Sequence, residues 1–359
     1  MVRQLNSLQS IRAFATIFVL LYHSTILFKT SYNYEFMYDI FSFGYAGVDI
    51  FFVLSGFLMF FLHSSDIGNS KVLKTFILKR FIRIYPIYWV VLLIIIFLNT
   101  FISNLGTEDS KDFINVLKSF ILIPQSQDDL LLSVSWTLSY EIFFYLCFCL
   151  LFIFNKNLRI ILGAVWIIVF IVLLFINVES YIVNFLFDPI NFEFLLGVLI
   201  ARIVLSKSQI KYSLYYVSGL IFWGFAILIE IYQLIEINRV IQFGIPSTLI
   251  IMGVVSKEIS GTIKKSKVLT YLGDASYSIY LTHYLLLSFL AKIFNSLNLF
   301  NLLGYGFSII LISITSLLLG CIFHMNIEKP MLKLLKTVFI NKFKNDSNLV
   351  KINKKSSIG

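Results

Sequence analysis

Charged residues are scarce in this sequence. Asp, Glu, Lys and Arg make up only 13% of its 359 residues, whereas hydrophobic types make up 58%. Soluble globular domains contain about a quarter charged residues, so this composition excludes an ordinary soluble protein. The mean hydropathy of +0.88 leads to the same conclusion. We therefore predict an all-α integral membrane protein.

Cysteine is rare as well. Cys147 and Cys149 lie in one apolar run and Cys321 in another. These spacings fit neither a disulfide scaffold nor a structural zinc site, so we expect three small packing residues and no metal.

Long apolar runs dominate the chain instead. A transmembrane helix needs about 20 mostly apolar residues, and about ten segments qualify. The first of them has no small-residue cleavage site, so we expect it to be a retained span rather than a signal peptide. The predicted spans lie near residues 12–28, 42–62, 84–101, 136–154, 160–177, 183–204, 211–230, 241–256, 275–294 and 304–325.

The basic residues then predict the orientation. With the N-terminus inside, nearly all of the 29 Lys and Arg residues fall on the inner side, as the positive-inside rule requires. Both termini should thus be cytoplasmic. The net charge of +10 is explained by topology, and we expect no nucleic-acid partner. The exceptions on the outer side are Lys29, Lys111, Lys118, Arg239 and Lys292.

Two further segments lie outside these spans. In the outer connection, residues 102–135, apolar side chains recur at helical spacing just before Pro124, which predicts an amphipathic helix on the outer membrane surface. Residues 1–335 should form one transmembrane domain, and 336–359 a basic cytoplasmic tail that is disordered or bound to lipid headgroups. The apolar residues of the amphipathic segment are Phe113, Val116, Leu117, Phe120 and Ile121.

Ionisable residues inside a bilayer are costly and mark function or a buried partner. The first span carries Arg12 at its entrance and His23 in its middle. Their spacing places both on one helix face, with a rise of about 16 Å between them, roughly half of the hydrocarbon thickness. Such a line suits a ligand whose anionic part stays at the surface while its reactive end reaches inward. The other buried ionisable residues are Asp49, Glu141, Glu193 and His283.

Several motifs now make the chain recognisable. Arg12 and His23 are followed by GYAGVDIFFVLSGF (44–57), KRFIRIYPIYW (79–89), SWTLSYE (135–141), GDASYSIYLTH (273–283) and EKP (328–330). In this order and at these spacings, the set resembles the membrane acyltransferase-3 family over nearly the whole chain. One departure is Thr282, where many relatives have Trp. This change concerns the fit of the acceptor or acyl chain.

The resemblance implies a multi-pass O-acyltransferase of the bacterial inner membrane. Such proteins move an acyl group, commonly acetyl, from cytoplasmic acyl-coenzyme A to a hydroxyl of a glycan or lipid-linked glycan. Acyl-coenzyme A, the glycan acceptor and membrane lipids are therefore the expected partners.

The residues support this chemistry on their own terms. Transfer from a thioester to a hydroxyl needs a base or a nucleophile that holds the acyl group, and imidazole can be either. We assign His23 to one of these roles, and the sequence does not choose between them. The Ser55-Gly56 pair lacks the second glycine of a nucleophile elbow, so we expect it to serve close helix packing.

The remaining candidates surround this centre. Arg12, Arg80 and Arg83 should bind the phosphates of coenzyme A, because guanidinium matches phosphate geometry; ordinary inner-surface anchoring is the alternative. His283 should line the donor tunnel. We expect Glu141 to act on an acceptor hydroxyl from the outer side or to pair with a buried cation. Asp49 should orient His23, or else form a structural pair.

Two other functions also fit parts of the pattern. Ten spans with buried Asp, Glu and His describe a proton-coupled secondary transporter too. However, the buried charges cluster in the first four spans, and no matching second half is visible. A catalytically inactive relative is the other alternative, and the presence of both Arg12 and His23 argues against it.

Overall fold

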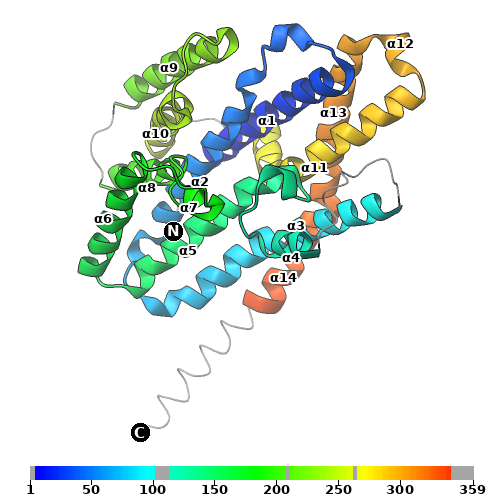
Figure 1. Ribbon diagram of the computed structural model, residues 1–359. Helices are drawn as coiled ribbons and strands as arrows, with labels where there is room; N and C mark the ends of the chain where they lie inside the picture. Colours follow the sequence, from blue (N-terminus) through cyan, green and yellow to red (C-terminus); the bar gives the residue numbers. More distant parts are fainter. Residues whose placement is uncertain (1–4, 102–112, 207–210, 262–264, 341–359) are drawn as a thin grey trace.

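The computed structural model describes residues 5–101, 113–206, 211–261 and 265–340, which form a bundle of helices without any strand (Figure 1). Within these residues, 10 helical segments are long and apolar enough to cross a membrane. The predicted all-α membrane fold is confirmed. An even number of crossings returns the chain to its starting side. That this side is cytoplasmic stays a prediction from the basic residues.

Helix α1 crosses the middle of the bundle, with the α9–α10 pair on one side of it and α11–α13 on the other (Figure 1). It packs mainly against α11 and also against α2 and α13, while α2 packs against α8. The long helices are α1 (Asn6–Tyr32), α2 (Gly47–His63), α3 (Leu73–Phe101), α5 (Trp136–Ile153), α6 (Lys156–Leu173), α8 (Asn191–Leu205), α9 (Tyr212–Tyr232), α10 (Ile245–Ile259), α11 (Lys267–Ser296) and α13 (Tyr305–Phe323). The short ones are α4 (Phe113–Ile121), α7 (Tyr181–Leu186), α12 (Leu299–Leu303) and α14 (Lys329–Leu335).

Two spans differ from their predicted form. Helix α3 begins at Leu73 instead of near residue 84, so Pro86 lies inside the helix and not in its first turn. The sixth span is two helices, α7 and α8, with a break that contains Pro189. The Asp188 carboxylate accepts the backbone N–H of Ile190 at 2.8 Å, which satisfies a donor that the break exposes. Proline placement and such local caps depend on tertiary context.

The start of α1 is held by a distant side chain. The backbone N–H groups of Asn6 and Ser7 donate to the Glu258 carboxylate at the end of α10, at 2.7 and 2.9 Å. These donors have no partner inside the helix, and a carboxylate also suits the positive end of the helix dipole. Glu258 therefore anchors the turn that precedes Arg12.

Two glycines allow helices near the site to touch. A Cβ at Gly273 of α11 would lie 2.0 Å from the backbone oxygen of Gln9 in α1. A Cβ at Gly56 of α2 would lie 2.0 Å from the backbone oxygen of Phe194 in α8. Only glycine permits these approaches. The close-packing role expected for Ser55-Gly56 is confirmed at Gly56.

Helix α4 coincides with the predicted amphipathic segment. It exposes Phe113 and Ile114, buries Asn115 and Ser119, and so turns its apolar face away from the bundle. Aromatic side chains of α3 hold its last carbonyls: Tyr88 Oη donates to Ser119 and Trp89 Nε1 to Phe120. Its place at the outer membrane surface stays a prediction. Of the predicted tail, residues 336–340 are helical, and 341–359 lie outside the described residues.

Candidate active site

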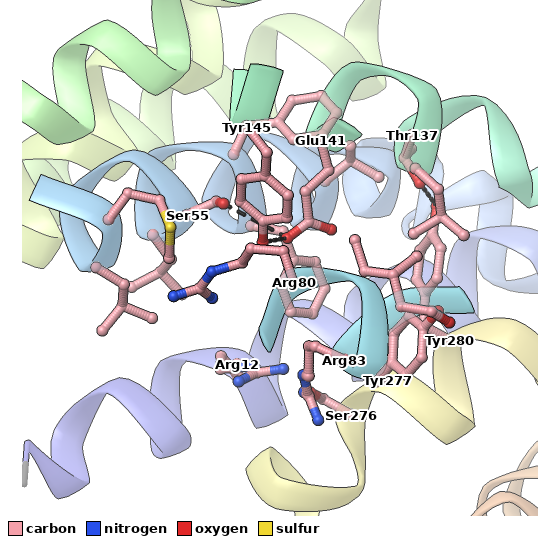
Figure 2. A pocket seen from close by; sticks show the side chains of 18 residues that line it. Arg12, Ser55, Arg80, Arg83, Thr137, Glu141, Tyr145, Ser276, Tyr277 and Tyr280 are labelled. Carbon is pink, nitrogen blue, oxygen red and sulfur yellow. Dashed lines mark hydrogen bonds between the residues drawn. The ribbon is translucent and has the colours of Figure 1, made fainter. Parts of the chain in front are cut away.

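A cavity of about 130 Å³ opens between α1, α2, α3, α5 and α11 (Figure 2). Val48 and Met59 of α2 both line it. They are about three helical turns apart, so the cavity extends roughly 16 Å along the helices. Its polar lining residues are Arg12, Ser55, Arg80, Arg83, Thr137, Glu141, Tyr145, Ser276, Tyr277 and Tyr280.

Helical spacing explains why these side chains meet. On α5, Thr137, Glu141 and Tyr145 follow one another at intervals of four residues and face the same way. On α11, Ser276, Tyr277 and Tyr280 form a similar stripe. Each sequence motif therefore supplies one face of one helix, and these faces line the same cavity.

The three predicted donor-site arginines all line this cavity, but their surroundings differ. No hydrogen bond or ion pair is found for the Arg12 guanidinium within the described residues. The Arg80 guanidinium stacks between Phe76 and Tyr145, 5.4 and 5.3 Å from the ring centroids, and its buried Nε lacks a hydrogen-bond partner in this part of the chain. Both cations are thus available to an anionic ligand.

Arg83, by contrast, is already paired. Its Nη1 donates to Glu328 at 2.9 Å, and Glu328 is fully buried. Glu328 also accepts Ser278 Oγ at 2.6 Å and lies 2.7 Å from His324 Nδ1. From the sequence, Glu328 was recognised only as part of the EKP motif (328–330) after the last span. Its position beside the last span could have identified it as the partner of a buried cation, since a buried carboxylate needs a cation or several hydrogen-bond donors.

Glu141 shares the cavity with the arginines. It accepts hydrogen bonds from the Tyr145 hydroxyl and, at 3.5 Å, from Ser55 Oγ (Figure 2). No ion pair involves it within the described residues. Glu141, Tyr145 and Ser55 line the same cavity as Arg12 and Arg80. That an acceptor reaches Glu141 from the outer side stays a prediction.

The two predicted histidines meet each other. His283 Nε2 lies 3.2 Å from His23 Nδ1, which joins α11 to α1. Neither histidine is among the cavity-lining residues. The connection runs through Tyr280, which lines the cavity and whose ring centroid lies 5.7 Å from that of His283. The histidine pair therefore sits one side-chain layer beyond the cavity.

Asp49 belongs to a separate cluster. The Arg239 guanidinium binds both of its carboxylate oxygens, with Nε at 2.8 and 3.0 Å and Nη2 at 2.7 Å. Asp49 is fully buried, and Arg239 also stacks over the rings of Tyr45 and Trp136. All hydrogen bonds found for its carboxylate go to Arg239, so the structural pairing left open by the sequence is present. Orientation of His23 by Asp49 stays a prediction.

Glu193 and a possible metal site remain to be described. Glu193 is fully buried, and neither of its carboxylate oxygens has a hydrogen-bond partner within the described residues. No group of His, Cys, Asp and Glu in that part of the chain could hold a metal ion.

The described residues contain ten apolar helical segments, and five of their helices line a cavity with three arginines; this is the architecture of a multi-pass membrane protein. A family model described as "Acyltransferase domain" matches residues 5–325, nearly the whole span of the bundle. The chain belongs to this family, which confirms the resemblance found in its motifs. It is a membrane acyltransferase, and the transporter alternative loses its support.

One curated relative is the exopolysaccharide production protein ExoZ of Rhizobium meliloti (strain 1021). It is 28% identical over 303 residues, which cover 82% of this chain and 91% of the relative. No solved structure matches the chain.

Proposed function

We propose that this protein transfers an acyl group, in the first place acetyl, from acyl-coenzyme A to a hydroxyl of a surface polysaccharide or its lipid-linked precursor. The membrane would be the bacterial inner membrane, with the donor entering from the cytoplasm. The observation that carries the proposal is the cavity whose Arg12 and Arg80 guanidinium groups have no carboxylate partner among the ion pairs found, with the His23–His283 pair behind its lining residue Tyr280.

The charge balance of the cavity favours an anionic donor. Arg83 is neutralised by Glu328, whereas Arg12 and Arg80 have no carboxylate partner among the ion pairs found. Against these two cations the cavity holds one further carboxylate, Glu141, so its lining keeps an excess of positive charge. Unpaired cations in a partly buried cavity are costly, and a phosphate group would offset that cost through charge-assisted hydrogen bonds. The elongated cavity then suits the neutral pantetheine arm of coenzyme A.

The reaction itself can follow either of two routes at His23. As a general base, the imidazole takes the proton of the acceptor hydroxyl while the new C–O bond forms and the C–S bond of the thioester breaks. As a nucleophile, it binds the acyl carbon first, and coenzyme A leaves as its thiolate. The acceptor oxygen then replaces the imidazole, whose freed nitrogen takes the hydroxyl proton and passes it to the thiolate. In both routes the thioester must pass Tyr280 to reach the histidine.

The acceptor class rests on the relative. ExoZ is named for exopolysaccharide production, and it aligns with most of this chain. A sugar hydroxyl at the membrane is therefore the acceptor that we propose.

The test uses the full-length protein in lipid nanodiscs with acetyl-coenzyme A and polysaccharide from the producing cell. Acyl transfer is followed by mass spectrometry of the glycan and by release of free thiol. We expect His23→Ala to lower kcat by about 10³-fold, because base and nucleophile are both lost. Arg202→Ala is the matched control, an exposed arginine at the end of α8 outside the cavity.

Full thiol release by His23→Ala would remove the imidazole from the mechanism. Acetyl transfer to water or lipid, but never to glycan, would contradict the acceptor class alone. Accumulation of a radiolabelled acetyl-protein in the absence of acceptor would select the nucleophilic route.

A further inference from the structure

We propose that His283 is a positioning residue for His23: together with the Val19 carbonyl it holds His23 in the tautomer with a proton on Nδ1, so that Nε2 is the reactive atom. The consequence for catalysis rests on the proposed function. The tautomer itself does not, and it can be measured separately.

The hydrogen bond of His283 to its own helix sets its protonation. His283 Nδ1 lies 2.6 Å from the backbone oxygen of Tyr280. A carbonyl oxygen only accepts, so Nδ1 of His283 must carry the proton. In a neutral imidazole the other nitrogen, Nε2, then has the free lone pair. His283 is 1% exposed, and the ring cannot turn to water to exchange these roles.

His23 is constrained in the same way. Its Nδ1 lies 2.9 Å from the backbone oxygen of Val19, one helical turn earlier. This nitrogen must therefore also be an N–H group, and it points toward the lone pair of His283 Nε2 at 3.2 Å. The three contacts agree with one proton assignment, in which the Nδ1–H of His23 is shared between Val19 and His283.

This assignment leaves Nε2 of His23 unprotonated. The ring is further bounded by Tyr22 and Tyr284, whose ring centroids lie 5.1 and 5.5 Å from its own, both edge-on. An imidazole nitrogen with a free lone pair is what a general base or an acyl acceptor needs.

His283 also supports the charge that the reaction creates. When Nε2 of His23 takes the hydroxyl proton, or forms a bond to the acyl carbon, the ring becomes cationic. Its Nδ1–H then donates a charge-assisted hydrogen bond to His283 Nε2, which is roughly twice as strong as a neutral one. Because the gain arises during the reaction and not on donor binding, it should raise kcat and leave KM for acyl-coenzyme A unchanged.

The first experiment reads the tautomer directly. Full-length protein with ¹⁵N-labelled histidine is reconstituted in lipid bilayers, and the imidazole signals are recorded by solid-state NMR. His23→Gln identifies the His23 signals by their loss. We expect a protonated Nδ1 and an unprotonated Nε2 in His23. In His283→Leu the Nδ1–H population should fall, because only the Val19 carbonyl is left to accept that proton. A wild-type His23 with its proton on Nε2 would overturn the proposal, whether or not the protein transfers acyl groups.

The second experiment separates positioning from donor binding. His283→Leu should lower kcat about 10²-fold with KM for acetyl-coenzyme A unchanged. His283→Gln should recover most of this loss, because its amide oxygen can accept the Nδ1–H of His23. Arg202→Ala serves as control, since Arg202 lies exposed at the end of α8 and does not line the cavity. A raised KM with unchanged kcat in His283→Leu would make His283 part of the donor site and defeat the proposal.

Discussion

Two partly buried groups of arginines in this protein can be compared. In the Asp49–Arg239 pair, Arg239 binds both oxygens of the fully buried Asp49 and stacks on two aromatic rings. In the cavity, Arg12 and Arg80 have no carboxylate partner among the ion pairs found. The same type of side chain thus forms a buried ion pair in one place and has no carboxylate partner among the ion pairs found in the other. The partner, not the residue type, decides which.

The largest expected effect on stability comes from breaking the Asp49–Arg239 pair. Asp49→Ala leaves the Arg239 guanidinium partly buried without its counter-ion, which should lower the free energy of unfolding by about 3–5 kcal/mol. Thermal unfolding of the purified protein in detergent measures this. Asp49→Leu combined with Arg239→Met should recover much of the loss. A stable Asp49→Ala protein that no longer transfers acyl groups would instead assign Asp49 to catalysis.

The cavity arginines should respond in the opposite way. Arg12→Ala removes a charge-assisted contact to the donor, so we expect Kd for coenzyme A to rise about 10–100-fold. Stability should be unchanged or higher, because an unpaired cation is lost. Isothermal titration calorimetry measures the affinity, with Arg202→Ala as control. Unchanged affinity in both Arg12→Ala and Arg80→Ala would exclude the phosphate site.

The smallest effect sharpens the description of the cavity itself. Ser55 Oγ contacts Glu141 only at 3.5 Å, so Ser55→Ala should cost less than about 1 kcal/mol of stability. Acyl transfer should stay within about threefold of the wild-type rate. A loss as large as that of His23→Ala would make Ser55 the nucleophile.

The fold was predictable in outline because apolar length is a strong signal. The ten spans and the amphipathic helix α4 follow from it. The early start of α3 and the break before α8 could not be predicted from apolar length. Whether a polar or proline-containing segment is helical depends on the tertiary contacts around it. Asp188 accepts the N–H of Ile190 and the hydroxyl of Tyr140, and such contacts make the break tolerable.

The sequence predicted which residues line the cavity better than it predicted which residues form ion pairs or hydrogen bonds with one another. Arg12, Arg80, Arg83 and Glu141 do share one cavity. The partnership of Arg83 with Glu328 joins residues far apart in the chain, and no local pattern reveals it. The same holds for Asp49 with Arg239 and for His23 with His283.

The amino-acid sequence alone determined that this chain is a helical membrane acyltransferase, and it placed Arg12 and His23 on one face of one helix. The length of an apolar segment and the helical period are local properties, so consecutive residues are enough to reveal them. Only the tertiary structure decided which buried charges are already neutralised and which nitrogen of His23 is free. Those properties depend on side chains that different helices bring within hydrogen-bond distance of one another.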